Sequence, residues 1–272
     1  RVRSGHLGAS RVLHVQRLLP LIPIQERHRW QDGQLPPGTT FENVQSLWDF
    51  DTKLRSATFS VLQHVETHLR SRLAYALGAV DPMIQRMPEL LHLDNPAEYP
   101  GWVDKLDRAI RHSHEDSIVH HRNNRDLVIP VWVAMDVLDW GGLTYLYGFA
   151  PRSVRDTVAS HFGLTAPQLR SWMKALNIVR NICAHHSRFF NRHYSLAARL
   201  PRAGELSELD DIAGTTGTSF AMLTLLHHLG TRTQGANRRL LPAVLARFPG
   251  DSGMNIQSTG APDGWSTHPL WR

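Results

Sequence analysis

The feature that most constrains this fold is a stripe of apolar residues that keeps the helical period for about eight turns, from residue 47 to residue 76. Its members recur at gaps of three and four, which places them on one face of a helix. Asp51 and Arg55 lie mostly off the stripe, and Gly78 followed by Asp81-Pro82 ends it. We therefore expect one long helix, or two joined by a kink. The stripe comprises Leu47, Phe50, Leu54, Thr58, Val61, Val65, Leu69, Leu73 and Ala76.

Further helical patterns follow along the chain, and no segment alternates strongly enough to predict a strand. Thr165 with Gln168 three residues later has the form of a capping box, so a helix should begin there. The Gly141-Gly142 pair could kink or split the helix around it. We predict an all-α bundle of about six helices. The later helices are expected near residues 102–125, 130–147, 153–162, 165–185, 219–229 and 237–248.

Length and composition fit one large domain, with or without a poorly ordered end. The chain has 272 residues, of which 42% are hydrophobic and 20% charged, a globular composition with enough residues for a core. The first residues keep neither the helical nor the strand period, and turn-forming residues follow at 36–38. We treat residues 1–36 as a divergent or incomplete N-terminal arm and residues 37–272 as the helical domain.

Several classes of protein are excluded by what the sequence lacks. Cys183 is the only cysteine, so neither an intramolecular disulfide framework nor a cysteine-based zinc cluster can form. No apolar run approaches the roughly 20 residues of a membrane span. The apolar run over residues 12–24 contains too many polar residues and prolines for a signal peptide. We expect a soluble, cytoplasmic protein without a membrane partner.

Motifs of cofactor and metal enzymes are missing as well. There is no phosphate-binding glycine loop, no nucleophile elbow and no H-E-x-x-H. A histidine group near residue 115 is a poor metal candidate, because adjacent histidines on a helix point apart and no carboxylate is fixed beside them. We expect no cofactor and no metal. The group comprises His112, His114, His120 and His121.

The charge is basic and is carried almost entirely by arginine. Lys+Arg number 30 and Asp+Glu 24, for a net charge of +6, and only Lys53, Lys105 and Lys174 are lysines. Arginine presents a planar fork suited to phosphate, so polyanions are candidate partners. The arginine bias is equally compatible with genome composition, and both interpretations stay open on charge alone.

One segment, residues 180–192, concentrates groups that could do chemistry. Its sequence is Arg-Asn-Ile-Cys-Ala-His-His-Ser-Arg-Phe-Phe-Asn-Arg. Histidine moves protons near neutral pH, and arginine holds a phosphodiester and stabilises the charge that develops on phosphorus. Asn181 and His185 share a helix face, whereas Arg180 and His185 lie about 140° apart on an ideal helix. This set suits metal-independent RNA cleavage if the two converge at the helix end or between two chains.

The spacing of arginine and histidine is by itself uninformative. Arginine followed five residues later by histidine should occur about 1.7 times by chance in this composition. It occurs three times, at Arg1/His6, Arg180/His185 and Arg188/His193. Requiring asparagine directly after the arginine lowers the chance expectation to roughly 0.06, and only Arg180-Asn181 meets it.

Arg180-Asn181-x3-His185 resembles the R-[N/D/H]-x3-H motif of HEPN-superfamily ribonucleases, and the chain around it is similar to the Abi-like (abortive infection) proteins of bacteria. The resemblance covers about residues 37 to 272. Residues 1–32 lack the tyrosine-rich segment that family members carry before the first block. The five blocks are residues 37–42, residues 48–55 running into 65–71, Pro130-Val-Trp132 leading to Trp140-Gly-Gly142, residues 180–192, and Asp263-Gly-Trp265 with Pro269-Leu-Trp271.

The resemblance implies a HEPN-like bundle that works as a homodimer and defends against phage by cutting RNA. Two motifs would face each other across a two-fold interface and form one site. His185 would transfer the proton, Arg180 would contact the phosphate and the transition state, and Asn181 would orient one or both. The sequence identifies neither an antitoxin nor a phage-derived trigger. His186, Arg188, Asn191 and Arg192 are then candidates for RNA contact or for support of the catalytic residues.

Structural interpretations compete with these assignments. Arg180, Asn181 and His185 could form a hydrogen-bond network that caps the helix, because cations are favoured at helix C-termini. Glu66 and Arg70 are an i, i+4 pair, which we assign to a structural network near the bundle centre. Core packing is expected for one cysteine and four tryptophans: Cys183, Trp102, Trp132, Trp140 and Trp172.

Three hypotheses follow. The first is a metal-independent ribonuclease toxin of abortive infection, expected to leave 2′,3′-cyclic phosphate ends. The second is a non-catalytic RNA-binding or regulatory protein that uses the same basic dimer groove and binds RNA in a salt-dependent way. The third and weakest is a structural helical protein whose basic charge reflects genome composition.

Overall fold

The structure is a computed structural model that describes residues 40–124, 128–250, 252 and 254–272. The predicted arm, residues 1–36, lies outside the described residues. The described chain is all-α, as predicted, and contains no strand beyond one isolated bridge between His193 and Thr218. None of its helices is long and apolar enough to cross a membrane.

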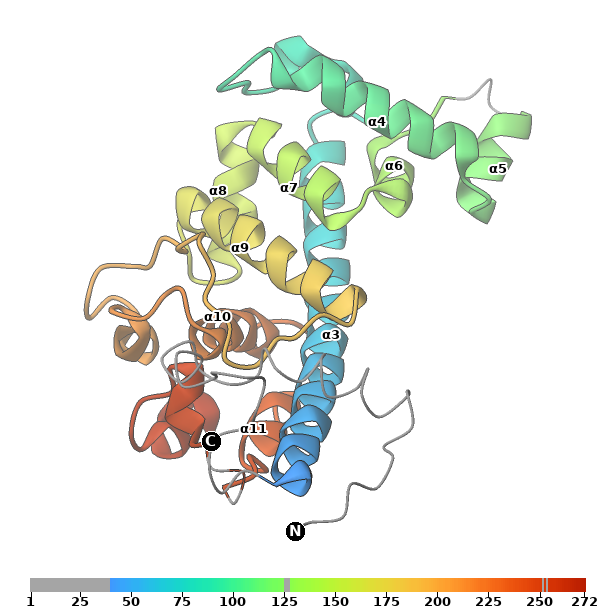
Figure 1. Ribbon diagram of the computed structural model, residues 1–272. Helices are drawn as coiled ribbons and strands as arrows, with labels where there is room; N and C mark the ends of the chain where they lie inside the picture. The colour runs from blue at the N-terminus through green and yellow to red at the C-terminus, as the bar shows by residue number, and fades with distance from the viewer. Residues whose placement is uncertain (1–39, 125–127, 251, 253) are drawn as a thin grey trace, which may run out of the picture.

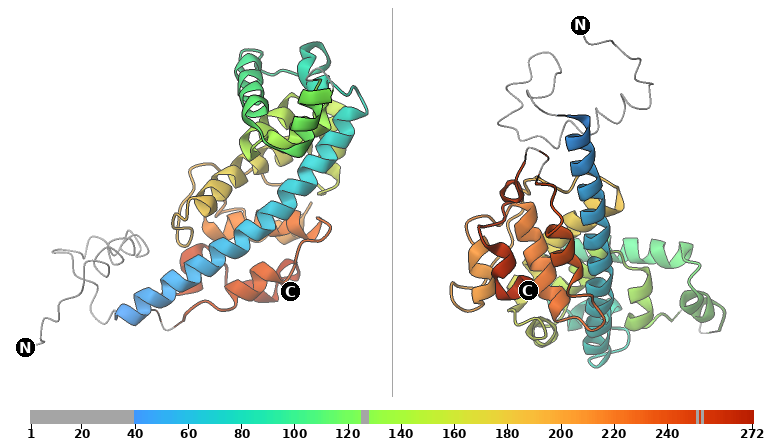
Figure 2. Two further views of the ribbon diagram at one scale, coloured as in Figure 1. Left: turned by 90° about the vertical axis from the view of Figure 1, so that its right-hand side faces the viewer. Right: turned by 90° about the horizontal axis from the view of Figure 1, so that it is seen from below.

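The long apolar stripe forms one unbroken helix, α3, from Phe41 to Gly78. Thr40 caps it in a capping box with Asn43, and the stripe residues from Leu47 to Leu73 are buried. Helix α3 runs the length of the described structure, and the helices beyond residue 130 pack along it (Figures 1 and 2). The prediction of a single long helix is confirmed, and the kinked alternative does not occur.

Nine α-helices lie within the described residues, more than the bundle of about six predicted, and two of the seven helical segments expected along the chain are each split. The chain breaks at Ser113, which has an extended backbone and whose hydroxyl accepts a hydrogen bond from the Glu115 N–H at 3.1 Å. It breaks again at Leu138, three residues before the glycine pair, because Asp139 caps the next helix by accepting from the Gly142 N–H at 2.6 Å. The resulting helices are α4 (Glu98–His112), α5 (Asp116–Asn124), α6 (Val131–Val137) and α7 (Trp140–Phe149).

The second half of the domain contains four more α-helices. Helix α9 begins with the predicted capping box between Thr165 and Gln168. Helix α11 is shorter than the predicted 237–248. Short 3₁₀ turns follow or precede these helices, including η4 (Ser207–Ile212) and three near the C-terminus, η5 (Ile256–Thr259), η6 (Trp265–Thr267) and η7 (Pro269–Trp271). The four helices are α8 (Arg152–Ser160), α9 (Ala166–Ala184), α10 (Ser219–Thr231) and α11 (Leu240–Leu245).

One continuous hydrophobic core joins these elements, from Val44 in α3 to Trp271 near the C-terminus. Trp102, Trp140 and Trp172 are buried in it, as predicted. The prediction for Trp132 is wrong, because its side chain is 50% exposed. Helix α6 is only seven residues long, and the Trp132 ring lies over Gly78, where an added Cβ would be 3.2 Å from the ring.

Candidate functional site

The Arg180–Arg192 segment spans the last turn of α9 and the loop that follows it. The helix ends at Ala184, and His185 is its C-cap. His186 has a φ of 53°, a left-handed conformation that glycine usually supplies at this position. The Ser187 N–H donates to the Ile182 carbonyl at 3.0 Å, and the His186 N–H donates to the Cys183 carbonyl at 3.2 Å. These two bonds form a Schellman motif, so backbone groups alone cap the end of α9.

A buried carboxylate on α3 fixes the loop beyond this cap. Asp51 is 1% exposed, and its Oδ1 accepts hydrogen bonds from the Phe189 N–H at 3.0 Å and the Phe190 N–H at 2.6 Å. Burial raises the pKa of the Asp51 carboxyl, while the bonds from Phe190 and Phe189 and the charge of Arg55 offset part of that rise. Asp51 thus replaces the helical partners that the two phenylalanine N–H groups lack in a loop.

Arg55, one turn further along α3, binds the same loop. Its Nη1 forms an ion pair with Asp51 Oδ2 at 3.1 Å and donates to the carbonyl oxygens of His186 at 2.9 Å and Ser187 at 3.2 Å. Its guanidinium also lies 5.8 Å from the centre of the Trp48 ring. The expectation that Asp51 and Arg55 lie off the buried face is wrong, because both are buried against the 186–190 loop.

The three predicted catalytic side chains project from this fixed helix end. Asn181 and His185 are exposed and Arg180 is half-buried. Among the described residues, none of the three side chains forms a hydrogen bond or an ion pair, and the buried Arg180 Nε lacks a partner. Since α9 is helical to Ala184, Arg180 and His185 stay about 140° apart around its axis on ideal geometry. Within one chain, α9 therefore presents them to different sides.

The supporting candidates fall into two groups. His186 is exposed on the loop. Arg188 and Arg192 are half-buried and shape the loop, because Arg188 Nη1 donates to the Asn191 carbonyl at 3.2 Å and Arg192 Nη1 donates to the Arg188 carbonyl at 3.3 Å. Asn191 itself has a φ of 49°. The two arginines are therefore held close to the motif by the loop that they stabilise.

Glu66 and Arg70 form an ion pair at a different place on α3. Arg70 also donates hydrogen bonds to the carbonyl oxygens of Met135 and Leu138, at the end of α6. Arg70 lies fifteen residues beyond Arg55, which is about 22 Å along the helix. The structure thus joins this pair to α6 and does not bring it to the Arg180–His185 region.

Two further observations concern metals and thiol chemistry. Within the described ranges, no group of three or more histidine, cysteine, aspartate or glutamate residues is arranged to hold a metal ion. Cys183 is buried on the core face of α9, and burial raises its pKa to about 12. The thiol is therefore neutral and a poor nucleophile near neutral pH.

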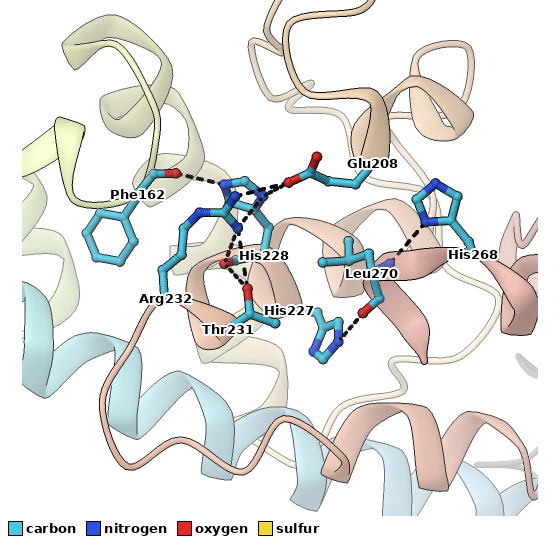
Figure 3. Close-up of polar contacts among 8 residues, drawn as sticks. All are labelled: Phe162, Glu208, His227, His228, Thr231, Arg232, His268 and Leu270. Atoms are coloured by element: carbon cyan, nitrogen blue, oxygen red, sulfur yellow. Dashed lines mark hydrogen bonds and ion pairs between the residues drawn. The ribbon is translucent and has the colours of Figure 1, made fainter.

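A second buried polar cluster contains none of the predicted site residues (Figure 3). His228 of α10 is fully buried, and its Nε2 donates to the Phe162 carbonyl at 2.8 Å. Its Nδ1 accepts from Arg232 Nη1 at 3.1 Å, and Arg232 Nη2 binds Glu208 Oε1 at 3.1 Å. Burial first, then the Arg232 charge, lowers the pKa of His228 to about 4. This cluster joins η4 to α10 through a neutral histidine.

Sequence reasoning missed the Asp51–Arg55 pair, although the signal was present. Asp51 directly follows Phe50 and Arg55 directly follows Leu54, so both lie beside the apolar stripe, at i, i+4 spacing. An acid and a base in this position face the edge of the core, where an irregular segment can use them to satisfy its backbone.

These features define a protein that is all-α over its described residues and holds an Arg-Asn-His group, without partners among those residues, at the end of one anchored helix. The family model described as Abi-like protein matches residues 21–191, more than half of the chain. The chain therefore belongs to the Abi-like family, which connects it with abortive infection. No curated protein and no solved structure matches the chain.

Proposed function

We propose that this Abi-like protein is a metal-independent endoribonuclease of the HEPN type, which cuts RNA to arrest phage-infected cells. His185 transfers the proton, Arg180 binds the phosphate and Asn181 orients them. The active form is a homodimer in which two motifs meet at one site. A dimer supplies what one helix does not, since Arg180 and His185 of a single α9 lie on different sides of its axis.

The observation that carries this proposal is that Arg180, Asn181 and His185 have no side-chain partner among the described residues. A capping network would use these side chains to bind the last carbonyls of α9. Those carbonyls instead receive backbone N–H groups, at 3.0 Å for Ile182 and 3.2 Å for Cys183. Three polar side chains on an anchored helix end are then free to bind a ligand, which is the arrangement that preorganised catalysis needs.

The reaction needs only proton transfer and charge stabilisation. His185 of one chain removes the proton from a ribose 2′-hydroxyl, whose oxygen attacks the adjacent phosphorus. The new bond joins phosphorus to the 2′-oxygen, and the bond to the 5′-oxygen of the next nucleotide breaks. The departing oxygen takes a proton from water, and the proton that His185 then releases neutralises the hydroxide left behind. Arg180 stabilises the negative charge that builds up on phosphorus.

A cleavage assay tests this mechanism directly. The purified protein, incubated with RNA in EDTA, should produce fragments ending in 2′,3′-cyclic phosphate. His185→Ala should abolish the cleavage, whereas His114→Ala, at an exposed histidine between α4 and α5, should not change it. If His185→Ala cleaves as well as the parent, the mechanism is wrong. Salt-dependent RNA binding without any cleavage would favour a non-catalytic RNA-binding protein.

A further inference from the structure

A basic cavity opens at the other end of α9 from the Arg180–His185 motif. Its volume is about 760 Å³, within the range of ligand sites. The segment before α4, helix α8, the first turns of α9 and the chain around residue 199 form its walls. We name it the α9 basic cavity after the five cations that line it, which are Arg152, Arg155, Arg170, Lys174 and Arg199.

The acids in the α9 basic cavity neutralise only part of this charge. Asp94 pairs with Arg170 at 2.6 Å, and Asp156 lies 3.6 Å from Arg152 in an exposed pair. These are the two acids among its lining residues. The remaining cations, Arg155, Lys174 and Arg199, form no ion pair within the described part of the chain. Three uncompensated positive charges that converge on one hollow create a field that attracts an anion.

Arg170 is held in place by the fold. A Cβ added at Gly148 of α7 would lie 2.8 Å from Arg170 Nε and Nη2, so the guanidinium rests directly on the α7 backbone. Glycine inside a helix is destabilising relative to alanine, and this contact gives Gly148 a structural reason. Within the described residues, the buried Nε groups of Arg155 and Arg170 have no hydrogen-bond partner.

Arg199 is also positioned by α9. Its backbone N–H donates to Ser171 Oγ at 2.9 Å, and its carbonyl accepts from Trp172 Nε1 at 2.9 Å. The 19-residue helix α9 begins at this wall, and its N-terminal dipole adds positive potential. The cationic side chains of the cavity and the dipole of α9 therefore both favour an anionic ligand.

The lining points to phosphate groups rather than to bases. Its described residues include no phenylalanine, tyrosine or tryptophan on which a base could stack. Arginine and lysine without aromatic side chains are typical of contacts to the nucleic-acid backbone, which carry no sequence information.

We propose that the α9 basic cavity binds the phosphodiester backbone of the RNA substrate, with Arg170 about 15 Å from Arg180 and about 22 Å from His185 along α9. This inference rests on the proposed function, because it assigns a second contact to the same RNA. The cavity holds the strand by its phosphates while the motif end acts on it. It thereby favours RNA long enough to reach both ends of α9.

Salt-dependent binding of a labelled single-stranded RNA tests the inference without any cleavage. The His185→Ala protein serves as the parent so that the RNA stays intact. Adding Lys174→Ala and Arg199→Ala, both at exposed positions, should weaken binding and flatten the plot of log affinity against log salt by about 1.4, which is 0.7 for each lost phosphate contact. The matched control is Lys105→Ala with Arg108→Ala, exposed on α4, and it should leave the slope unchanged.

Each outcome separates this inference from the proposed function. An unchanged slope in the Lys174/Arg199 variant overturns the cavity assignment but leaves the ribonuclease proposal intact. A parent that binds inorganic tripolyphosphate and no RNA overturns both. In the cleavage-competent protein, the Lys174/Arg199 variant should raise the KM for a long RNA at least threefold. The same variant should leave the KM for a short oligonucleotide unchanged. An equal rise for both RNAs contradicts a second, distant contact.

Discussion

Arg55 donates a hydrogen bond of 2.9 Å to the carbonyl oxygen of His186, the residue that turns the chain out of α9 with a φ of 53°. Residues 131 positions apart thus fix the conformation of the segment that carries the candidate catalytic histidine. The bond connects the longest helix of the fold to the place where a small displacement would matter most for catalysis.

Replacing Arg55 should therefore damage both stability and activity. Arg55→Met leaves Asp51 buried without its charge partner, and losing one member of a buried pair costs about 3–5 kcal/mol. Chemical denaturation measures this loss. Asp51→Asn with Arg55→Met should be less destabilised than the sum of the single variants, because neither charge is then left alone. Lys53→Met, at an exposed position on the same helix, is the control. An equal loss of stability in that variant would contradict the role assigned to Arg55.

His186→Gly should stabilise the protein. A side chain in the left-handed region costs about 1–2 kcal/mol, and glycine avoids this cost while losing some backbone entropy. We expect a net gain of about 0.5–1 kcal/mol in the free energy of unfolding. Asn191→Gly, at a φ of 49°, should gain less because asparagine tolerates this conformation. If His186→Gly is stabilised yet cleaves RNA more slowly, the imidazole itself contributes to activity.

Local signals explain what could be predicted from this sequence. The apolar stripe of α3, its end at Gly78 and the Thr165–Gln168 capping box are each set by neighbours in the chain, and each is confirmed. The split of the helix over 130–147 is anticipated at the glycine pair, but it lies at Leu138 because it depends on a cap from Asp139. The glycine pair was the more conspicuous breaker, yet it lies inside the first turn of α7.

The environment of the motif was harder to predict, because it is set by residues far away in the sequence. Asp51 and Arg55 meet the loop 131 to 139 positions later, and no local pattern specifies that pairing. Trp132 follows the apolar pattern, but a seven-residue helix at the edge of the fold cannot bury it. The motif residues could be found from composition and spacing, whereas their lack of partners required the structure.

Acid should weaken the protein through His228. Burial lowers its folded-state pKa to about 4, below the ordinary 6.5, so the unfolded chain takes up the proton first as the pH falls. The contribution of neutral His228 to the free energy of unfolding is fully present above pH 6.5. It is lost between about pH 6.5 and 4, by up to about 3 kcal/mol. Urea unfolding across this range measures it. The amide of His228→Gln can still donate to the Phe162 carbonyl but does not titrate, so this variant should lose less stability between pH 6.5 and 4. A loss as large as that of the parent would contradict the assignment to His228.

A composite site between two chains predicts complementation. Arg180→Ala and His185→Ala should each be inactive alone. Unfolding the two together and refolding them should yield mixed dimers in which one site combines His185 from one chain with Arg180 from the other, and cleavage should return. Mixing without unfolding, when exchange is slow, is the control. If the mixture stays inactive although mass spectrometry detects the mixed dimer, the two residues act within one chain.

The last prediction concerns the part of the chain beyond the family match, which ends at residue 191. The hydrophobic core does not end there, because Trp271 is buried against Phe220 and stacks on His227 at 4.7 Å. Trp271→Ala should therefore cost about 3–5 kcal/mol, as for other buried aromatic residues, while Trp271→Phe should cost less.

Thermal and urea unfolding compare these two variants with the parent. A loss below about 1 kcal/mol for Trp271→Ala would show that the C-terminal turns add little to the core. The expected large loss means that α10 and the C-terminal turns help to hold α3 in place. Because α3 carries Asp51 and Arg55, the anchor of the motif then depends on a segment that the family match does not include.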